Sequence, residues 1–346
     1  MKRLTMTAAL VLAAPAAAQD APVNVPAFAL PASNQLSPEA RKVLTRMKEA
    51  TGPSNIEGDV AKQRAFYQKW NDNRLAEMRR HYQTVERREK MGGVTVDIVD
   101  PAGGIRAGNK ARVLINIHGG AFMWGSGSGA LVEAIPIAAV MGVRVVTIDY
   151  RMAPENHYPA ASEDVTAVYR QLLKLYRPEN IGIYGCSAGG VITAQSVAWI
   201  ASKGLRRPGA IGTFCGTGAP FSGDSPFISG PITGGKPLPA PALPPVLPVS
   251  YMVGVPANDP LAYPLTDPPT IKAMPPTLLL AGGRDFAVSA LTLAHRRLQA
   301  AGVDSELQLF DGLPHAFFMW PDMPESQEAF DIVARFFDRH LGRKPR

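Results

Sequence analysis

The stretch that decides the fold is residues 181–190, with the sequence IGIYGCSAGG. Its first half is a buried-type apolar run that predicts a β-strand, and the small residues after it open a helical pattern. A turn sharp enough to join strand to helix needs small residues on both sides, here Gly185 and Gly189, and it raises the Ser187 hydroxyl above the sheet. We therefore expect Ser187 to be a nucleophile, with the N–H of Ala188 facing the anion that forms beside it.

Patterns typical of strands and helices alternate on both sides of this turn. Runs that predict strands occupy residues 94–99, 113–117, 143–148, 277–280 and 306–310, and helical patterns occupy residues 161–175, 289–301 and 325–340. Strand, helix and strand in succession favour a mainly parallel central sheet with helices on both faces. We expect an α/β catalytic domain over residues 91–346, in which residues 221–269, rich in proline and glycine, form a cap or lid insertion.

The first 90 residues do not follow this alternation. Residues 1–18 carry Lys2 and Arg3, then an apolar stretch too short to span a bilayer, then small residues, which is typical of a signal peptide. This pattern predicts a periplasmic or secreted protein, in which residues 19–36 are a proline-rich linker. Two amphipathic helical patterns within residues 37–90 predict a helical cap, because they must pack on something larger.

A second glycine pair follows the strand predicted at residues 113–117, in the sequence His118-Gly119-Gly120. Adjacent glycines let the backbone approach a ligand and point its N–H groups at developing negative charge. We expect Gly119 and Gly120 to form an oxyanion hole together with Ala188. His118 either holds this loop or acts as a base, but a base that precedes the nucleophile is typical of β-barrel proteases, so the loop-holding role is favoured.

In an α/β-hydrolase the catalytic acid and then the base follow the serine along the chain. Three histidines do so, and two of them, His295 and His340, lie in helical patterns. His315 instead lies in a loop just past a predicted strand, and Asp285 likewise follows the end of a strand. We therefore expect Asp285 to orient His315, and His315 to activate Ser187.

Taken together, the His118 loop, residues 150–155 (YRMAPE), the Ser187 turn, Asp285 and His315 resemble the hormone-sensitive-lipase-like family, the bacterial family IV carboxylesterases. The similarity runs from about residue 94 to residue 341. It implies an α/β-hydrolase fold with an N-terminal helical cap.

The resemblance also implies a role for each matching residue. Ser187 would be the nucleophile, Asp285 the acid and His315 the base, and the oxyanion donors would be Gly119, Gly120 and Ala188. Several positions depart from the family pattern, including Ser289 where a second acid often follows the catalytic one. Ala121 stands where the family's loop has a third glycine, and Cys186 stands where an acidic residue often precedes the serine.

These residues predict a serine hydrolase that cleaves carboxylic esters of short to medium acyl chain through an acyl-enzyme on Ser187. A lactonase or an amidase would use the same three residues, and a non-catalytic binding protein on this fold is a third alternative. The expected partner is a small-molecule ester, while homodimerisation stays open.

Composition argues against several other classes of protein. The chain carries 36 Lys and Arg against 29 Asp and Glu, a net charge of +7, but these charges are scattered, so nucleic-acid binding is not expected. Two cysteines cannot build a disulfide framework or a cysteine-based metal centre, and the six histidines show no metal-ligand spacing. We therefore expect no metal and no cofactor, and no stretch after the first 18 residues is long enough for a membrane span.

Overall fold

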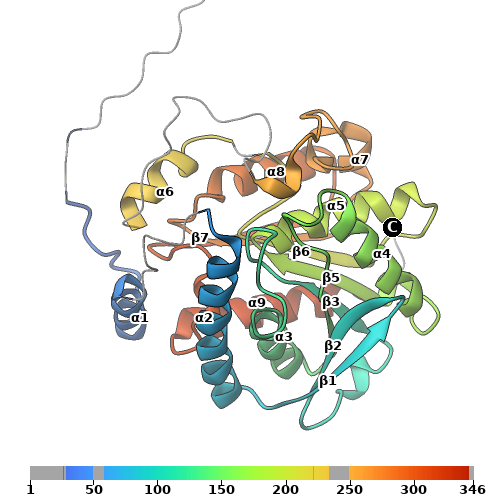
Figure 1. Cartoon of the computed structure of the whole chain (residues 1–346), viewed down its shortest axis with the longest axis horizontal. Helices are drawn as coiled ribbons and strands as arrows, with labels where there is room; N and C mark the ends of the chain where they lie inside the picture. Colours follow the sequence, from blue (N-terminus) through green and yellow to red (C-terminus); the bar gives the residue numbers. More distant parts are fainter. Residues whose placement is uncertain (1–25, 27–28, 50–57, 221, 234–248, 343–346) are drawn as a thin grey trace, which may run out of the picture. The chain divides into compact units, whose positions relative to one another are not determined.

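A central sheet of eight strands organises the part of the chain that this computed structural model describes, which is residues 26, 29–49, 58–220, 222–233 and 249–342. The strands are β1 (Thr84–Met91), β2 (Val94–Pro101), β3 (Val113–Ile117), β4 (Arg144–Ile148), β5 (Ile181–Cys186), β6 (Ala210–Phe214), β7 (Thr277–Gly282) and β8 (Ser305–Phe310). Their order in space is β1-β2-β4-β3-β5-β6-β7-β8 (Figure 1). The β1–β2 and β2–β4 pairs are antiparallel and the other pairs are parallel, so the predicted mainly parallel sheet is confirmed.

Helices cover both faces of the sheet. They are α1 (Pro38–Glu49), α2 (Val60–His81), α3 (Ser128–Met141), α4 (Ala160–Leu172), α5 (Ala188–Ser202), α6 (Ser225–Thr233), α7 (Pro268–Lys272), α8 (Val288–Ala300) and α9 (Pro324–His340). Side chains of α4, α5 and α8 share one hydrophobic core with one face of the sheet. Side chains of α3 and α9 form the core on the other face, where α1 and α2 also pack (Figure 1).

The inner strands are apolar because both of their faces are covered. β3 (VLINI) and β7 (TLLLAG) are buried at every residue. In the parallel register, Ile117 of β3 lies beside Gly185 of β5, and Gly282 of β7 lies beside Phe310 of β8. The loops that leave the carboxyl ends of these four strands therefore gather at one edge of the sheet, which is where ligands bind in open α/β sheets.

The cap boundary predicted at residue 90 is wrong. Residues 84–91 (TVERREKM) form β1, which pairs with β2 over its full length through a turn at Gly92 and Gly93. β1 is mostly exposed, so its charged side chains gave no apolar signal for a strand. The helical segment therefore consists of α1 and α2 and ends at His81.

The predicted insertion at residues 221–269 is described only in part, since residues 221 and 234–248 lie outside the described residues. Within it, the Ser225 hydroxyl donates to the Phe286 carbonyl oxygen at 2.7 Å, and the Ser229 hydroxyl donates to the Arg284 carbonyl oxygen at 3.0 Å. α6 thus packs against the loop that carries Asp285.

The predicted signal peptide, residues 1–18, and residues 19–25 of the predicted linker also lie outside the described residues. Within the described ranges, no helix combines the length and the apolar character needed to cross a membrane.

Candidate active site

Ser187 lies at the turn between β5 and α5 with φ 57° and ψ −121°, a backbone conformation that is strained for any residue except glycine. The glycines on either side of Ser187 are needed because any side chain there would clash with β3. A Cβ atom at Gly185 would lie 2.2 Å from the Ile117 carbonyl oxygen, and one at Gly189 would lie 1.8 Å from the same oxygen. The Ser187 N–H donates to the Phe214 carbonyl oxygen at 2.7 Å, so it fixes the turn rather than facing the site.

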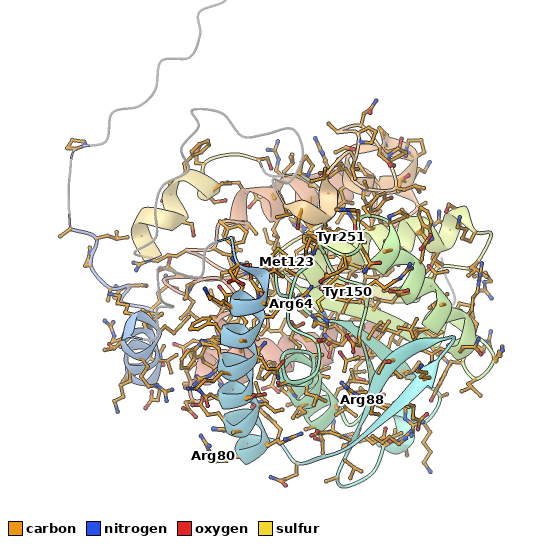
Figure 2. The ribbon with its side chains drawn as sticks, in the orientation of Figure 1. Arg64, Arg80, Arg88, Met123, Tyr150 and Tyr251 are labelled. Carbon is orange, nitrogen blue, oxygen red and sulfur yellow. The ribbon has the colours of Figure 1, made fainter. Side chains whose placement is uncertain are left out.

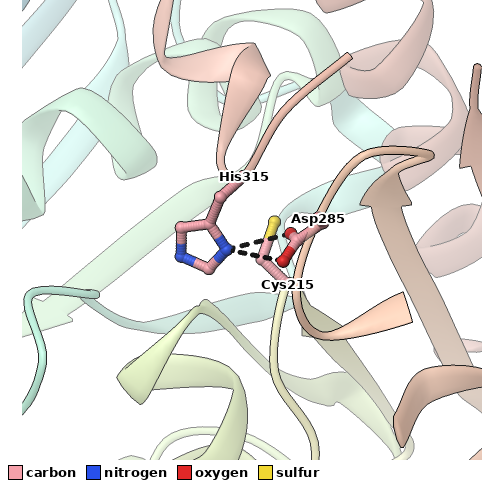
Figure 3. Close-up of side chains that lie close together, drawn as sticks. All are labelled: Cys215, Asp285 and His315. Atoms are coloured by element: carbon pink, nitrogen blue, oxygen red, sulfur yellow. Dashed lines mark hydrogen bonds and ion pairs between the residues drawn. The ribbon is translucent and has the colours of Figure 1, made fainter. Parts of the chain in front are cut away.

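Asp285 and His315 are brought together from the ends of β7 and β8 (Figure 3). The Nδ1 atom of His315 lies 2.9 Å from each carboxylate oxygen of Asp285. Asp285 is buried, and its Oδ1 atom also accepts the Ala287 N–H at 2.8 Å, which fixes the carboxylate. A proton on Nδ1, donated to Asp285, leaves Nε2 of the neutral ring free to accept a proton.

The His118 loop leaves β3 beside this pair, and the structure contradicts one prediction made for it. The Gly119 N–H is already donated to Oε1 of Glu133 at 2.7 Å, so it does not face the site as a free donor. The next two residues, Gly120 and Ala121, have φ of 114° and 50°. Within the described residues we find no acceptor for the N–H groups of Gly120, Ala121 or Ala188.

His118 lies behind the loop and is fully buried. Its Nδ1 atom lies 2.7 Å from the Gly119 carbonyl oxygen, and its ring stacks on Tyr150 with centroids 4.3 Å apart. Burial lowers the pKa of His118 to about 4, so the ring is neutral at neutral pH. These contacts suit the loop-holding role and not that of a base.

A cavity of about 390 Å³ joins these groups, with Ser187, His315, Gly119 and Gly120 in its wall. Helices α1 and α2 supply part of the opposite wall through Met47, Tyr67, Trp70 and Asn71. The Tyr67 ring stacks on Trp124 with centroids 4.2 Å apart and planes 7° from parallel. The cavity is therefore closed on one side by apolar and aromatic side chains from the N-terminal helices.

Arg64 attaches α2 to two of the loops noted in the sequence (Figure 2). Its guanidinium donates to the Met123 carbonyl oxygen at 2.8 Å and to the Ala153 carbonyl oxygen at 2.9 Å. It also forms a two-point ion pair with Glu155, the last residue of the YRMAPE segment, at 2.8 and 2.7 Å. The helix that bears Tyr67 and Trp70 is thereby held over the site.

Comparison with known proteins identifies the fold family. A family model described as the alpha/beta hydrolase fold matches residues 114–319, which is more than half of the chain. The chain belongs to the α/β-hydrolase fold family.

Three similar proteins narrow this assignment. An acetyl esterase of Salmonella schwarzengrund is 26% identical over 320 residues, which are 89% of this α/β-hydrolase and 96% of that protein. A solved structure of an esterase named E25 has a TM-score of 0.79 and 28% identity, covering 92% of this chain and 99% of that one. A solved esterase of the bacterial hormone-sensitive lipase family has a TM-score of 0.74 and 27% identity, covering 88% of this chain and 99% of that one. The family resemblance predicted from the sequence is confirmed.

Two thiols lie near Ser187, Asp285 and His315 in this α/β-hydrolase. Cys186 and Cys215 are buried, free and in contact with each other, and burial raises the pKa of both. Cys215 lies beside Asp285 and His315, with one ligand atom of each within 4.8 Å of the others (Figure 3). A metal ion there would need a deprotonated thiol and would displace the hydrogen bond between His315 and Asp285, so these residues suit proton transfer better than metal binding.

Sequence reasoning missed Ala121 and Glu133. Ala121 was noted only as a departure from the family, although it adopts the positive φ expected of a glycine there. Glu133 lies in α3, which was not predicted because its sequence is apolar on every side. One signal was available, since Glu133 is the single charged residue in that apolar run.

Proposed function

We propose that this α/β-hydrolase cleaves carboxylic esters of short to medium acyl chain through an acyl-enzyme on Ser187. The observation that carries the proposal is the Asp285–His315 pair, with Nδ1 2.9 Å from both carboxylate oxygens, in the same cavity wall as Ser187 on its strained turn. The chain is a carboxylesterase by its family and by its similarity, over nearly its whole length, to esterases.

In the first half of the reaction, Ser187 Oγ attacks the ester carbonyl carbon while Nε2 of His315 takes the hydroxyl proton. Asp285 stabilises the imidazolium through Nδ1. The tetrahedral intermediate collapses, the alcohol leaves with the proton from Nε2, and the acyl group stays on Ser187. In the second half, water gives a proton to Nε2 and attacks the acyl carbon. The bond between the acyl carbon and Ser187 Oγ then breaks, Nε2 returns its proton to Oγ, and the carboxylic acid is released.

The oxyanion of each intermediate needs N–H donors that are not already engaged. Gly120 and Ala188 meet this condition, as does Ala121, whereas the N–H groups of Gly119 and Ser187 have other acceptors. We therefore assign the oxyanion hole to Gly120, Ala121 and Ala188, in place of the set that included Gly119.

The acyl-length proposal rests on the size and lining of the cavity. About 390 Å³ is near the small end of ligand pockets, and the wall formed by α1 and α2 limits how far an extended chain can reach. We propose that these two helices act as a cap that selects substrates.

The test is a hydrolysis series on p-nitrophenyl acetate, butyrate, octanoate and palmitate, with a γ-lactone and a p-nitroanilide alongside. We expect turnover of the first three esters, little of the palmitate, and a loss of about 10⁴-fold or more in kcat for Ser187→Ala. Turnover of the lactone or the anilide at a higher kcat/KM than every ester would replace the proposal with a lactonase or an amidase. Absence of turnover on all substrates would favour a binding protein.

A further inference from the structure

Glu133 is a buried carboxylate in the active-site wall that the mechanism above does not use. Its side chain comes from α3 and lines the same cavity as Ser187 and His315, yet the residue is only 6% exposed. Oε1 accepts the Gly119 N–H at 2.7 Å, and Oε2 accepts the Asn116 side-chain N–H at 3.2 Å. The amide oxygen of Asn116 accepts the Thr147 hydroxyl at 2.7 Å, which fixes the orientation of that amide.

The ionised carboxylate of Glu133 is energetically unfavourable in this position. Apolar side chains, including Ile137, Phe330 and Val333, surround it on the side of α9, and no Lys or Arg in the described residues forms an ion pair with it. Burial raises the pKa of Glu133 to about 7, while the hydrogen bonds from Gly119 and Asn116 act in the opposite direction. The fold destabilises the charged form of Glu133. A functional role therefore explains this residue better than a contribution to stability does.

The contact with Gly119 acts on the next two peptide groups. Fixing the Gly119 N–H fixes the start of the loop whose Gly120 and Ala121 N–H groups have no acceptor among the described residues. Space there is narrow, because a Cβ atom at Gly119 would lie 2.9 Å from the Cys186 carbonyl oxygen and 3.4 Å from Oε1 of Glu133. The carboxylate therefore holds the loop against the Ser187 turn. Even a small displacement of oxyanion donors lowers the reaction rate substantially.

A second effect is electrostatic. Glu133 and His315 line the same cavity, and their opposite charges attract each other when Glu133 is ionised and His315 is protonated during the reaction. The other titratable groups around Glu133 are His118, Tyr150, Tyr184 and Cys186, and all four are buried and neutral at neutral pH. His315 is therefore the group near Glu133 whose charge changes during turnover.

We propose that Glu133 is a positioning residue of ester hydrolysis, which holds the oxyanion loop through the Gly119 N–H and supplies a second negative charge to the His315 imidazolium. This inference rests on the proposed function of Ser187, Asp285 and His315.

The decisive variant is Glu133→Gln, which keeps the shape and one acceptor oxygen but removes the charge. An exposed acid, Glu163 on α4, supplies the matched control Glu163→Gln. On p-nitrophenyl acetate at pH 8 we expect Glu133→Gln to lower kcat about 10-fold or more with KM changed less than about 3-fold, and the control to match the wild type. The acid side of its kcat/KM profile should move to lower pH, because the imidazolium has lost a stabilising charge.

Thermal unfolding separates this role from a structural one. We expect the Tm of Glu133→Gln at pH 8 to equal or exceed that of the wild type, so that activity falls without a loss of fold. A wild-type kcat and pH profile in Glu133→Gln would overturn the inference. So would a fall in kcat that comes with a lower Tm at pH 8 and an unmoved pH profile.

A fluorophosphonate distinguishes failure of this inference from failure of the proposed function. If the wild type is labelled on Ser187 and hydrolyses the ester while Glu133→Gln behaves like it, only the role of Glu133 is wrong. If the wild type is neither labelled nor active on any ester, both proposals fall together.

Discussion

At the scale of single residues, Asp285 is distinguished by the contact of both its carboxylate oxygens with His315. It holds His315 Nδ1 and the Ala287 N–H while remaining buried, so the ring of His315 has one favoured tautomer. We expect Asp285→Asn and His315→Ala each to lower kcat about 10³-fold or more with the fold intact. Asp304→Asn, a change at an exposed acid, is the control. Steady-state kinetics with wild-type rates in either variant would assign the role to another residue.

Position, rather than intrinsic reactivity, decides between the two adjacent candidates for the nucleophile. Cys186 is the intrinsically better nucleophile, but its thiol is buried and has a raised pKa, whereas Ser187 occupies the strained turn. We expect a fluorophosphonate to label Ser187, Ser187→Ala to abolish turnover, and Cys186→Ala to keep substantial activity. Peptide mapping by mass spectrometry locates the label. Loss of activity in Cys186→Ala together with survival of Ser187→Ala would reverse the assignment.

The raised pKa of Glu133 also predicts how stability changes with pH. An acid whose pKa rises from 4.5 in the unfolded chain to about 7 in the fold binds its proton more tightly when folded. Its stabilising contribution is therefore complete below pH 4.5 and is lost as the pH rises through 7. Between pH 5 and pH 8 we expect the unfolding free energy of the wild type to fall by about 2 kcal/mol relative to Glu133→Gln. Urea unfolding of both proteins at the two pH values measures this difference, and parallel pH dependences would contradict it.

At the scale of elements, Arg64 is one of the side chains that attach α2 to the loops around Ser187. Arg64 contacts the carbonyl oxygens of Met123 and Ala153 and the carboxylate of Glu155. We expect Arg64→Ala to raise KM about 3- to 10-fold and to change kcat less, because the Tyr67 and Trp70 wall loses its attachment while the catalytic groups keep theirs. Kinetics on the graded esters test this, with Lys69→Ala, an exposed change on the same helix, as the control. Unaltered KM on every ester would show that this wall does not contact substrate.

The elements that could be located from sequence alone are those with a clear pattern of apolar residues or a capping residue. β3 and β7 were placed because buried parallel strands are continuously apolar. α1 was placed by its capping residue Ser37, whose hydroxyl accepts the Ala40 N–H at 3.0 Å, and α2 by the helical spacing of its apolar residues. β1 was missed because it is an exposed, charged strand, and α3 because it is apolar on every side. Neither carries the period that marks its class.

The same limit applies to the site. Ser187, Asp285 and His315 follow strand ends, so the parallel topology places them at one edge of the sheet before any side chain is considered. Which N–H groups of the His118 loop can act as donors depends on the orientation of each peptide group. Gly119 looks identical to Gly120 in the sequence, but its N–H is engaged by Glu133, a residue 14 positions along the chain, and only Gly120 has a positive φ.

At the scale of the whole molecule, residues 1–18 carry a further proposal, that they direct export to the periplasm or the medium. Expressed in a bacterial host, the exported protein is expected to begin at or near Gln19. N-terminal mass spectrometry of periplasmic and medium fractions measures this, and replacement of Lys2 and Arg3 by Glu should reduce the exported fraction. An active protein that keeps Met1 and stays in the cytoplasm would contradict the proposal.

The parallel sheet also sets the order in time in which the site becomes complete. The ribosome makes the His118 loop after β3 first, Ser187 after β5 next, and Asp285 and His315 after β7 and β8 last. A growing chain that ends before residue 315 therefore lacks the base that we propose for Ser187. β7 pairs with β6 and β8, so Asp285 and His315 follow the two strands of the sheet that are synthesised last. On the proposed mechanism, ester cleavage therefore requires the last strand of the sheet, and a nascent chain without β8 and His315 is expected to be inactive.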